Sequence, residues 1–314
     1  MTTVRDLGEF GLIRRLQNRL GARMRSRSAV IAGIGDDCAV LRTGDPNRFL
    51  LYTCDPVVEG VHYRAGTPPR QIGWKAMARN LSDIAAMGGL PRWAVVSIGL
   101  RAATPVSHVE RMYDGLRAAA EKFGCVIVGG DTTRVKHEPF VVVALLGEVE
   151  KSKLALRSGA KIGDSLFVTG TLGGSLRGKH LTFTPRVAEA RWLVQHFPIH
   201  AMIDLSDGLS SDLQRLVEAG KNKVGFEIHA AEVPISLAAQ GRLNAALNDG
   251  EDFELLFTVD PRDATALRKQ WRKKFKLPLT EIGCVVRAPG KIFLIGTDGR
   301  KCRLKPSGYD HFAR

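Results

Sequence analysis

Aspartates beside small residues recur in short segments that are spread over most of the chain. They lie in residues 35–37, 53–55, 80–83, 129–133 and 204–208, and residues 250–252 form a related segment with a glutamate. Carboxylates so distant in sequence cannot share one helix face, because successive residues on such a face are three or four apart. They can meet only where the fold of the whole chain brings several elements to one place.

A cluster of such carboxylates needs cations to be stable. Two unit charges about 4 Å apart repel each other by about 4 kcal/mol at an effective dielectric constant of about 20. Oxygen ligands gathered in number are what Mg²⁺ prefers, and Mg²⁺ in proteins usually also binds phosphate groups. The dispersed carboxylates therefore predict a magnesium-dependent enzyme that acts on phosphorylated substrates.

The composition is that of a globular protein with room for one large or two ordinary domains. Of the 314 residues, 44% are hydrophobic and 25% are charged, which allows proper cores. We expect no membrane span and no signal peptide, because long apolar runs are missing and the N-terminal segment is polar. The five cysteines form no CxxC pair, which favours a reduced, cytoplasmic chain without zinc or disulfides.

The chain is strongly basic, with a formal net charge of +14. Such a charge suits nucleic-acid binding, but the basic residues are spread along the chain. The densest run, residues 268–276, has the pattern of an exposed helix face and its end. We therefore expect a solvated surface there, and a diffuse positive field that attracts anionic substrates.

Apolar periodicity predicts a mixed α/β (α+β) architecture, in which helices and strands alternate in both halves. Helices are expected at residues 6–20, 69–87, 107–123, 185–195, 210–219 and 262–273. Strands are expected at residues 30–34, 49–53, 93–100, 125–128, 140–146, 165–169, 201–203, 254–259, 280–286 and 291–295.

Local signals indicate where two of these segments begin and end. Ser107 with Glu110 has the spacing of a capping box, which predicts the start of the helix there. Gly124 has the position of a glycine that ends a helix. A polar stretch at 148–158 predicts a boundary between two domains, residues 1–149 and 150–314.

Three segments in the first half are candidate cation sites. Two successive aspartates end the segment 33–37, for which the alternative is an ordinary surface turn. Residues 53–55 follow a strand, and sites in α/β folds tend to lie at strand ends. Asp83 lies within an otherwise apolar helical run, where an unpaired carboxylate is costly. It either caps a neighbouring element or binds a cation, and we favour the cation.

Two further segments combine carboxylates with features that bind phosphate. Residues 129–134 have the form of a strand and a turn, in which glycine amides approach phosphate oxygens and Asp131 bridges through Mg²⁺. Residues 204–208 follow a strand and lead into a helix, whose N-terminus adds positive potential. Capping of that helix by Asp207 is an equally open alternative.

A Walker-like spacing in the second half is discounted. Residues 173–180 have the GxxxxGK spacing of a phosphate-binding P-loop, but they end in His180 where Ser or Thr should hold Mg²⁺. The sequence therefore does not predict a P-loop nucleotide site.

Taken in order, the motifs resemble those of the thiamine-monophosphate kinases, a family of the AIR-synthase-like (PurM-like) ATP-binding superfamily. The resemblance spans nearly the whole chain. It rests on GIGDDCAVL (33–41), residues 55–62, KAMARNLSDIAAMG (75–88), GGDTTR (129–134), RSGAKIGD (157–164), IDLSDGL (203–209), GEDFEL (250–255) and the tail GYDHF (308–312).

The resemblance implies a fold and a reaction. The fold is PurM-like with two domains, in which the N-terminal sheets of two subunits join in a barrel-like core of a homodimer and the C-terminal half forms an α/β lobe. In the reaction, ATP and thiamine monophosphate give ADP and thiamine diphosphate with the help of several Mg²⁺ ions.

The resemblance also implies roles for individual residues. Gly130, Asp131, Arg157 and Ser206 fall on ATP positions, and His62, Glu251 and Tyr309 fall on thiamine-phosphate positions. Arg157 and Asp131 are the residues expected to act in catalysis. The positions that hold Mg²⁺ in the family are Asp37, Thr53, Cys54, Asp55, Asp83, Asp131, Asp204 and Asp207.

Two residues depart from the family pattern. Cys54 stands where many relatives have threonine, and a thiol is a poor Mg²⁺ ligand, although a ligand made by the backbone carbonyl is unaffected. Arg79 stands where a small apolar residue is more usual.

The expected mechanism is direct in-line transfer, because the attacking phosphate oxygen is largely ionised at neutral pH and needs no side-chain base. Three alternatives stay open. They are an ATP-dependent enzyme of the same superfamily with a different acceptor, a basic nucleic-acid-binding protein with a vestigial metal site, and a catalytically degraded relative.

Overall fold

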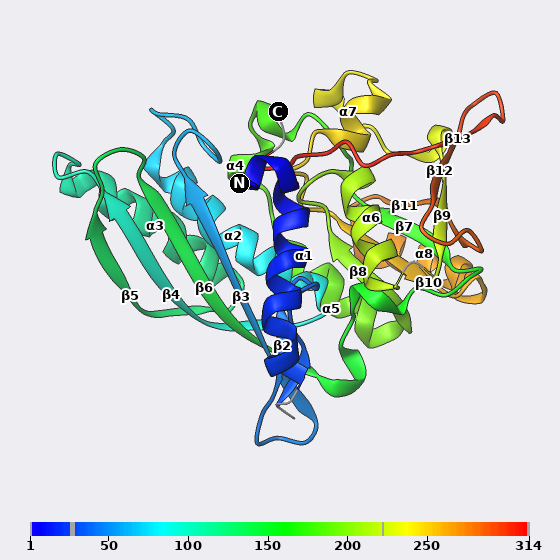
Figure 1. Cartoon of the computed structure of the whole chain (residues 1–314), viewed down its shortest axis with the longest axis horizontal. Coiled ribbons are helices and arrows are strands. Elements are labelled where there is room, and N and C mark those ends of the chain that lie inside the picture. Colours follow the sequence, from blue (N-terminus) through cyan, green and yellow to red (C-terminus); the bar gives the residue numbers. More distant parts are fainter. Residues whose placement is uncertain (1, 26–28, 222, 313–314) are drawn as a thin grey trace.

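The chain folds into two lobes that lie side by side, with the helix α1 (Val4–Arg25) across the front between them (Figure 1). The structure, a computed structural model, describes residues 2–25, 29–221 and 223–312. Each lobe is built around one mixed sheet. Within the described residues, no helix is both long and apolar enough to cross a membrane.

The N-terminal lobe contains a six-stranded sheet in the order β1-β2-β3-β6-β4-β5. Its strands are β1 (Val30–Ala32), β2 (Ala39–Arg42), β3 (Arg48–Val58), β4 (Leu90–Leu100), β5 (Val126–Arg134) and β6 (Phe140–Glu150). Only β4 and β5 run parallel to each other. Alternate residues of β6 are buried, because one face of the sheet packs on the helices α2 (Pro69–Ala86) and α3 (Val106–Lys122) while the other face stays open.

Two glycines let α2 and α3 pack with their backbones in close contact. A Cβ atom at Gly73 would lie 1.9 Å from the carbonyl oxygen of Met112, and one at Gly115 would lie 1.9 Å from that of Arg70. This close packing holds α2 against the sheet. Met77, Leu81 and Ile84 are fully buried, as the helical periodicity predicts.

The C-terminal lobe contains a seven-stranded sheet in the order β13-β12-β9-β11-β7-β10-β8. Its strands are β7 (Ser165–Thr169), β8 (Ile199–Asp204), β9 (Gly225–His229), β10 (Leu255–Val259), β11 (Leu279–Val286), β12 (Ile292–Ile295) and β13 (Lys301–Arg303). Its helices are α4 (Lys179–Thr182), α5 (Val187–His196), α6 (Leu209–Ala219), α7 (Leu243–Asn248) and α8 (Pro261–Lys274).

A continuous apolar core joins the two lobes. It runs from the buried face of the N-terminal sheet through α2 to residues of α5, β10 and α8, such as Leu193, Phe257 and Trp271. A second core lies on the α6 side of the C-terminal sheet. The helix α2 is therefore fixed between the lobes, with the end of β8 beside it.

The expected mixed α/β architecture is confirmed, and most expected helices and strands lie within a few residues of the observed ones. Gly124 ends α3 with a φ of +72°, as predicted. The closed barrel is not seen, because neither sheet formed by the described residues closes on itself. A barrel-like core shared by two subunits stays a prediction.

Two local predictions were wrong. The capping box at Ser107 is not formed: α3 begins one residue earlier with Pro105 at the N-cap, and among the described residues no side chain caps it. The expected turn after Val128 is also absent, since β5 continues through Gly129 and Gly130 to Arg134. A Cβ atom at Gly130 would lie 1.9 Å from the carbonyl oxygen of Val96, so that glycine serves close strand packing.

Candidate active site

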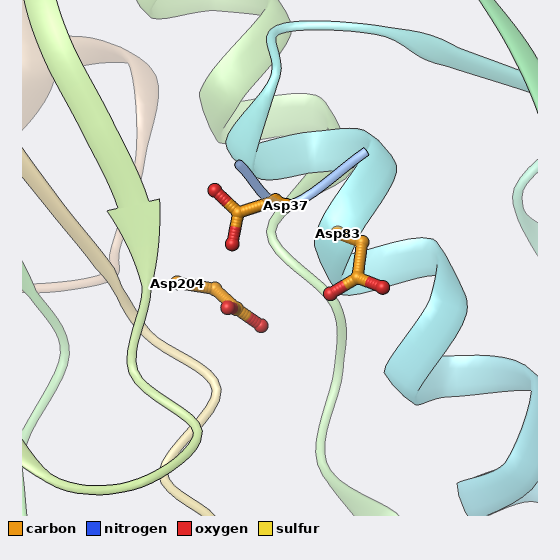
Figure 2. A group of neighbouring side chains, drawn as sticks. All are labelled: Asp37, Asp83 and Asp204. Carbon is orange, nitrogen blue, oxygen red and sulfur yellow. The ribbon is translucent and has the colours of Figure 1, made fainter. Parts of the chain in front are cut away.

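Three carboxylates from separate elements meet at the junction of the lobes. Asp37 lies in the loop before β2, Asp83 in α2 and Asp204 at the end of β8. One oxygen atom of each lies within 4.8 Å of the other two, and Figure 2 shows the three groups around one space. We call Asp37, Asp83 and Asp204 the carboxylate cluster.

Neighbouring side chains hold these carboxylates in position. Arg157 binds Asp37 with two hydrogen bonds, from Nε at 3.1 Å and from Nη2 at 2.5 Å. The hydroxyl of Ser82 donates to Asp204 at 2.5 Å, and the hydroxyl of Thr53 donates to Asp83. The backbone N–H of Arg157 also donates to the neighbouring Asp36.

Burial and mutual repulsion disfavour the ionised form of this cluster. Burial, together with the charge of Asp37, raises the pKa of both Asp36 and Asp204 to about 7. Burial and the charges of Asp55 and Asp204 raise the pKa of Asp83 well above its usual range. Full ionisation therefore requires added positive charge. The donors are hard oxygens from carboxylates and a hydroxyl, which suit Mg²⁺ and not a soft metal.

A second group of charged residues, centred on Glu251, lies beside the carboxylate cluster. The Nζ atom of Lys75, which is fully buried, binds Glu251, the carbonyl oxygen of His62 at 2.7 Å and Nδ1 of His180 at 2.8 Å. Burial opposes ionisation of Glu251, but its contact with His180 and the charges of Lys75 and Arg79 outweigh it and lower its pKa to about 2. Glu251 is thus a firmly ionised carboxylate.

The loop that presents Glu251 has an unusual backbone. Glu251 and Phe253 have φ values of +56° and +50°, in the left-handed region that non-glycine residues rarely adopt. Such conformations cost about 1–3 kcal/mol each and tend to occur at functional sites. Hydrogen bonds from the N–H of Glu251 to the carbonyl of Ser206, at 2.7 Å, and from the N–H of Phe253 to the carbonyl of Leu205, at 2.8 Å, hold the loop.

His62 and Tyr309 lie next to this group. His62 accepts a hydrogen bond at Nδ1 from the N–H of Val58 at 3.0 Å, and burial with the charge of Arg79 lowers its pKa to about 3. Its neutral ring lies 5.4 Å from the ring of His311, which lies 4.9 Å from that of Tyr309. The structure therefore brings His62, Glu251 and Tyr309 to one side of the carboxylate cluster.

The C-terminal tail is attached beside Asp207, at the start of α6. The N–H of Gly308 donates to Ser211 Oγ at 3.0 Å, and the N–H of Tyr309 donates to the carbonyl of Asp207 at 2.9 Å. Capping of α6 by Asp207 is not observed. The N-cap is Gly208, and Asp212 accepts hydrogen bonds from the N–H groups of Asp207 and Gly208.

Arg79 lies between the two groups of residues, one helical turn from Asp83. Its Nε donates to Asp55 at 3.1 Å and its Nη1 to Glu251 at 3.5 Å. Asp55, expected as a metal ligand, is therefore paired with a guanidinium. It lies on the same face of β3 as Thr53, because strand residues two apart point to the same side.

Three expected site residues do not join the cluster through their side chains within one chain. The side chain of Cys54 lies on the open face of β3, opposite Thr53 and Asp55, so a thiol ligand is not part of the site. Gly130 and Asp131 lie on the exposed edge strand β5, which β4 and β6 separate from β3. Their roles stay predictions.

The site also contains residues that sequence reasoning did not assign. Lys75, Arg79 and His180 all contact Glu251. A usable signal was the spacing of Lys75, Arg79 and Asp83, four residues apart on one expected helix, which places them on the same face. Sequence alone gave no signal for His180, which is 105 residues from its partner Lys75.

The Walker-like segment is correctly discounted. The backbone N–H of Gly173 donates to Asp252 at 2.8 Å, and that of Gly174 donates to Asp249 at 2.9 Å. Amides that bind the protein's own carboxylates do not form an open phosphate cradle.

Comparisons with known proteins place this site in a family. Residues 35–149 match the family profile "AIR synthase related protein, N-terminal domain", and residues 154–295 match "AIR synthase related protein, C-terminal domain". The chain therefore belongs to the AIR synthase related proteins, and the relatives described next show that its family within them is that of the thiamine-monophosphate kinases.

The thiamine-monophosphate kinase of Rhodopirellula baltica is 39% identical, with 93% of this chain and 95% of the relative covered. That of Bacillus subtilis is 34% identical, with 98% of this chain and all of the relative covered. The solved structure of AaThiL complexed with AMPPCP and TMP is 33% identical, has a TM-score of 0.83 and covers 99% of both chains. A HypE–HypF complex, 18% identical with a TM-score of 0.73, shares the fold.

Proposed function

We propose that this protein transfers the γ-phosphoryl group of ATP to thiamine monophosphate, which gives ADP and thiamine diphosphate. The observation that carries the proposal is the proximity of two groups of residues. A carboxylate cluster suited to Mg²⁺ lies directly beside the ionised Glu251 and its partners. A related protein has been solved with AMPPCP and TMP together, the pair of ligands that such a site needs.

Several Mg²⁺ ions are part of the proposal. Asp37, Asp83 and Asp204 would hold them, with Asp55, Asp207 and the hydroxyl of Thr53 as further oxygen ligands. When bound, Mg²⁺ neutralises the phosphates and the charge that develops during transfer. The raised pKa values of Asp83 and Asp204 support this assignment, because metal binding keeps such groups ionised.

For ATP, Arg157 is the residue that we assign to the transferring phosphoryl group. Asp37 holds its guanidinium at the carboxylate cluster, and a guanidinium binds phosphoryl oxygens through paired N–H groups. Ser206 lies in the same loop as Asp204 and Asp207. Gly130 and Asp131 complete the proposed ATP set, and their place on the sheet edge makes their role depend on the assembly.

For the acceptor, Glu251, His62 and Tyr309 form the proposed thiamine side of the site. Glu251 supplies a negative charge for the cationic ring, and the exposed phenol of Tyr309 borders it. His62 is neutral and its Nδ1 is occupied, so it orients the substrate and does not act as a base. No side-chain base is needed, because the attacking phosphate oxygen is already ionised.

A homodimer is the proposed assembly. Tyr52, Leu146, Trp93 and Val126 stand opposite one another across β3, β6, β4 and β5 on the open sheet face, and Trp93 is 44% exposed. Contiguous apolar patches of this kind mark interaction surfaces.

In the described part of the chain all five cysteines are free, which accords with the proposed cytoplasmic location.

The direct test is a product assay with Mg²⁺ and ATP. We expect ADP and thiamine diphosphate from thiamine monophosphate, and little ADP from thiamine or from other phosphorylated acceptors. Turnover with another acceptor but not with thiamine monophosphate would overturn the proposal in favour of a different enzyme of the superfamily. Binding of RNA or DNA without any ATP turnover would favour a nucleic-acid-binding role instead.

A further inference from the structure

We propose that Arg79 binds the phosphate group of the acceptor and thereby makes the enzyme prefer a phosphorylated acceptor over the free alcohol. This inference rests on the proposed function and names the residue that selects its substrate. The position of Arg79, the state of its hydrogen-bond donors and the charges around it support this role.

Arg79 lies between the two parts of the site on one helix face. Lys75, Arg79 and Asp83 follow one another at intervals of four residues along α2, which puts successive residues about 6 Å apart along the axis. Lys75 belongs to the Glu251 group and Asp83 to the carboxylate cluster. A substrate whose ring lies at Glu251 and whose reacting oxygen lies at the carboxylates must therefore place its phosphate beside Arg79.

The guanidinium of Arg79 is fixed, with one side available. Nε and Nη1 bind Asp55 and Glu251, and the ring of Phe253 lies 5.9 Å from the guanidinium carbon. Phe253 is itself stacked on Phe183. Nη2 has no hydrogen-bond partner among the described residues, and 13% of the side chain is exposed. A ligand can therefore reach donors that the fold has already oriented.

The charges around the site favour a guanidinium at this position. A phosphate that approaches Asp55 and Asp83 meets carboxylate repulsion, whereas the guanidinium of Arg157 is paired with Asp37. Arg79 is the cation that contacts Asp55. A planar guanidinium binds phosphate oxygens through two parallel N–H bonds, which a lysine cannot do. Arg79 thus recognises the group that distinguishes thiamine monophosphate from thiamine.

The test measures equilibrium binding of thiamine monophosphate and of thiamine by calorimetry, in buffer with Mg²⁺ and without ATP. For Arg79→Met we expect thiamine monophosphate to bind about tenfold to hundredfold more weakly, the usual loss for hydrogen bonds to a charged group. Thiamine affinity should change less than about threefold, because thiamine lacks the phosphate. Arg70→Met, at an exposed arginine of the same helix, is the matched control and should leave both affinities unchanged.

A second variant covers the case in which Arg79→Met folds poorly, since it leaves Asp55 and Glu251 without this partner. Arg79→Lys keeps the charge but loses the paired N–H groups of the guanidinium. It should lower the affinity for thiamine monophosphate by an intermediate amount and leave the affinity for thiamine unchanged. Equal losses for both ligands, or no loss for either, would overturn the inference. Turnover of the unaltered protein tests the proposed function separately, because discrimination between the two ligands is measured without any reaction.

Discussion

Asp83 is the residue whose surroundings say most about the site. It lies in a helix whose neighbouring side chains are mostly buried, and Asp55, Asp204 and Asp37 all raise its pKa in addition to its burial. A protein that needed only a hydrogen-bond acceptor for Thr53 could use a neutral side chain at this position. The charge is retained at a cost to stability, which indicates a role in binding cations.

Replacement of Asp83 separates that role from the fold. Asp83→Asn keeps the shape and an oxygen that accepts from Thr53, but it removes one charge from the cluster. We expect kcat to fall by at least about hundredfold, because metal ions contribute several kcal/mol to phosphoryl transfer. The melting temperature should stay the same or rise, because carboxylate repulsion is relieved. Unchanged turnover would contradict a metal role for Asp83.

The raised carboxylate pKa values also predict how stability depends on pH. Asp36 and Asp204 have pKa values of about 7 in the folded protein and about 4 when unfolded. Between these values the folded state binds more protons than the unfolded state, so this contribution lowers stability as pH rises from about 4 to 7. Mg²⁺ should therefore raise the melting temperature more at pH 8 than at pH 5.5. Equal shifts at both pH values would show that the ion does not bind beside these carboxylates.

The residue scale also shows what a sequence can and cannot predict. The convergence of Asp37, Asp83 and Asp204 was predictable, because each follows a strand or interrupts an apolar helix. The pairing of Lys75 with Glu251 was not, because 176 residues separate them and only the packing of the two lobes sets their distance. From the sequence, Arg79 could be recognised only as a departure from the family pattern, because its partners Asp55 and Glu251 are known only from the structure.

At the scale of elements, the segment 170–183 depends on a buried ionic network. Glu254 is almost fully buried and accepts hydrogen bonds from Arg186 at 2.6 and 2.7 Å, from Lys179 at 3.0 Å and from Thr169 at 2.8 Å. Lys179 lies in α4, next to His180 of the Glu251 group. The network that stabilises this segment therefore also holds His180 in place at the substrate side of the site.

Glu254→Gln tests that network. Loss of one partner from a buried ion pair leaves the other charges uncompensated, so we expect unfolding to require about 3–5 kcal/mol less free energy. Asp260→Asn, which alters an exposed pair with Arg262, is the control and should leave the free energy of unfolding nearly unchanged. Urea denaturation measures both. A loss at Glu254 no larger than that of the control would mean that the network is not coupled to the fold.

Elements were predictable where one periodicity dominates, as in α2, β6 and β7. The wrong prediction at Gly129 and Gly130 arose because glycine is common both in turns and where two strands pack closely. Gly129 and Gly130 were interpreted as a turn, but β4 and β5 come so close that Gly130 has no room for a side chain. Short strands such as β2 and β13 carry too few residues for alternation to be distinguished from a loop.

At the scale of the whole molecule, the open face of the N-terminal sheet is the feature that a single chain does not explain. Its apolar row at Tyr52, Leu146, Trp93 and Val126 would be solvated in a monomer. The same sheet carries Gly130 and Asp131 on its exposed edge. An assembly that covers this face would also change the surroundings of those two residues.

Light scattering on the purified protein tests the dimer. We expect the unaltered chain to be a dimer and Trp93→Asp to be largely monomeric, because a buried charge in an apolar interface lacks a partner. Trp93→Phe, which keeps an aromatic ring at this position, should stay dimeric. A monomeric unaltered protein would refute the proposed assembly.

The central claim is that the carboxylate cluster binds divalent ions between two bound phosphate compounds. The most direct measurement is electron paramagnetic resonance of Mn²⁺ as a substitute for Mg²⁺, with thiamine monophosphate and a non-hydrolysable ATP analogue present. We predict that the unaltered protein binds Mn²⁺ more tightly when both ligands are present than with either alone, and that Asp204→Asn loses this gain. Mn²⁺ binding that is indifferent to the ligands, or unchanged in Asp204→Asn, would contradict the claim.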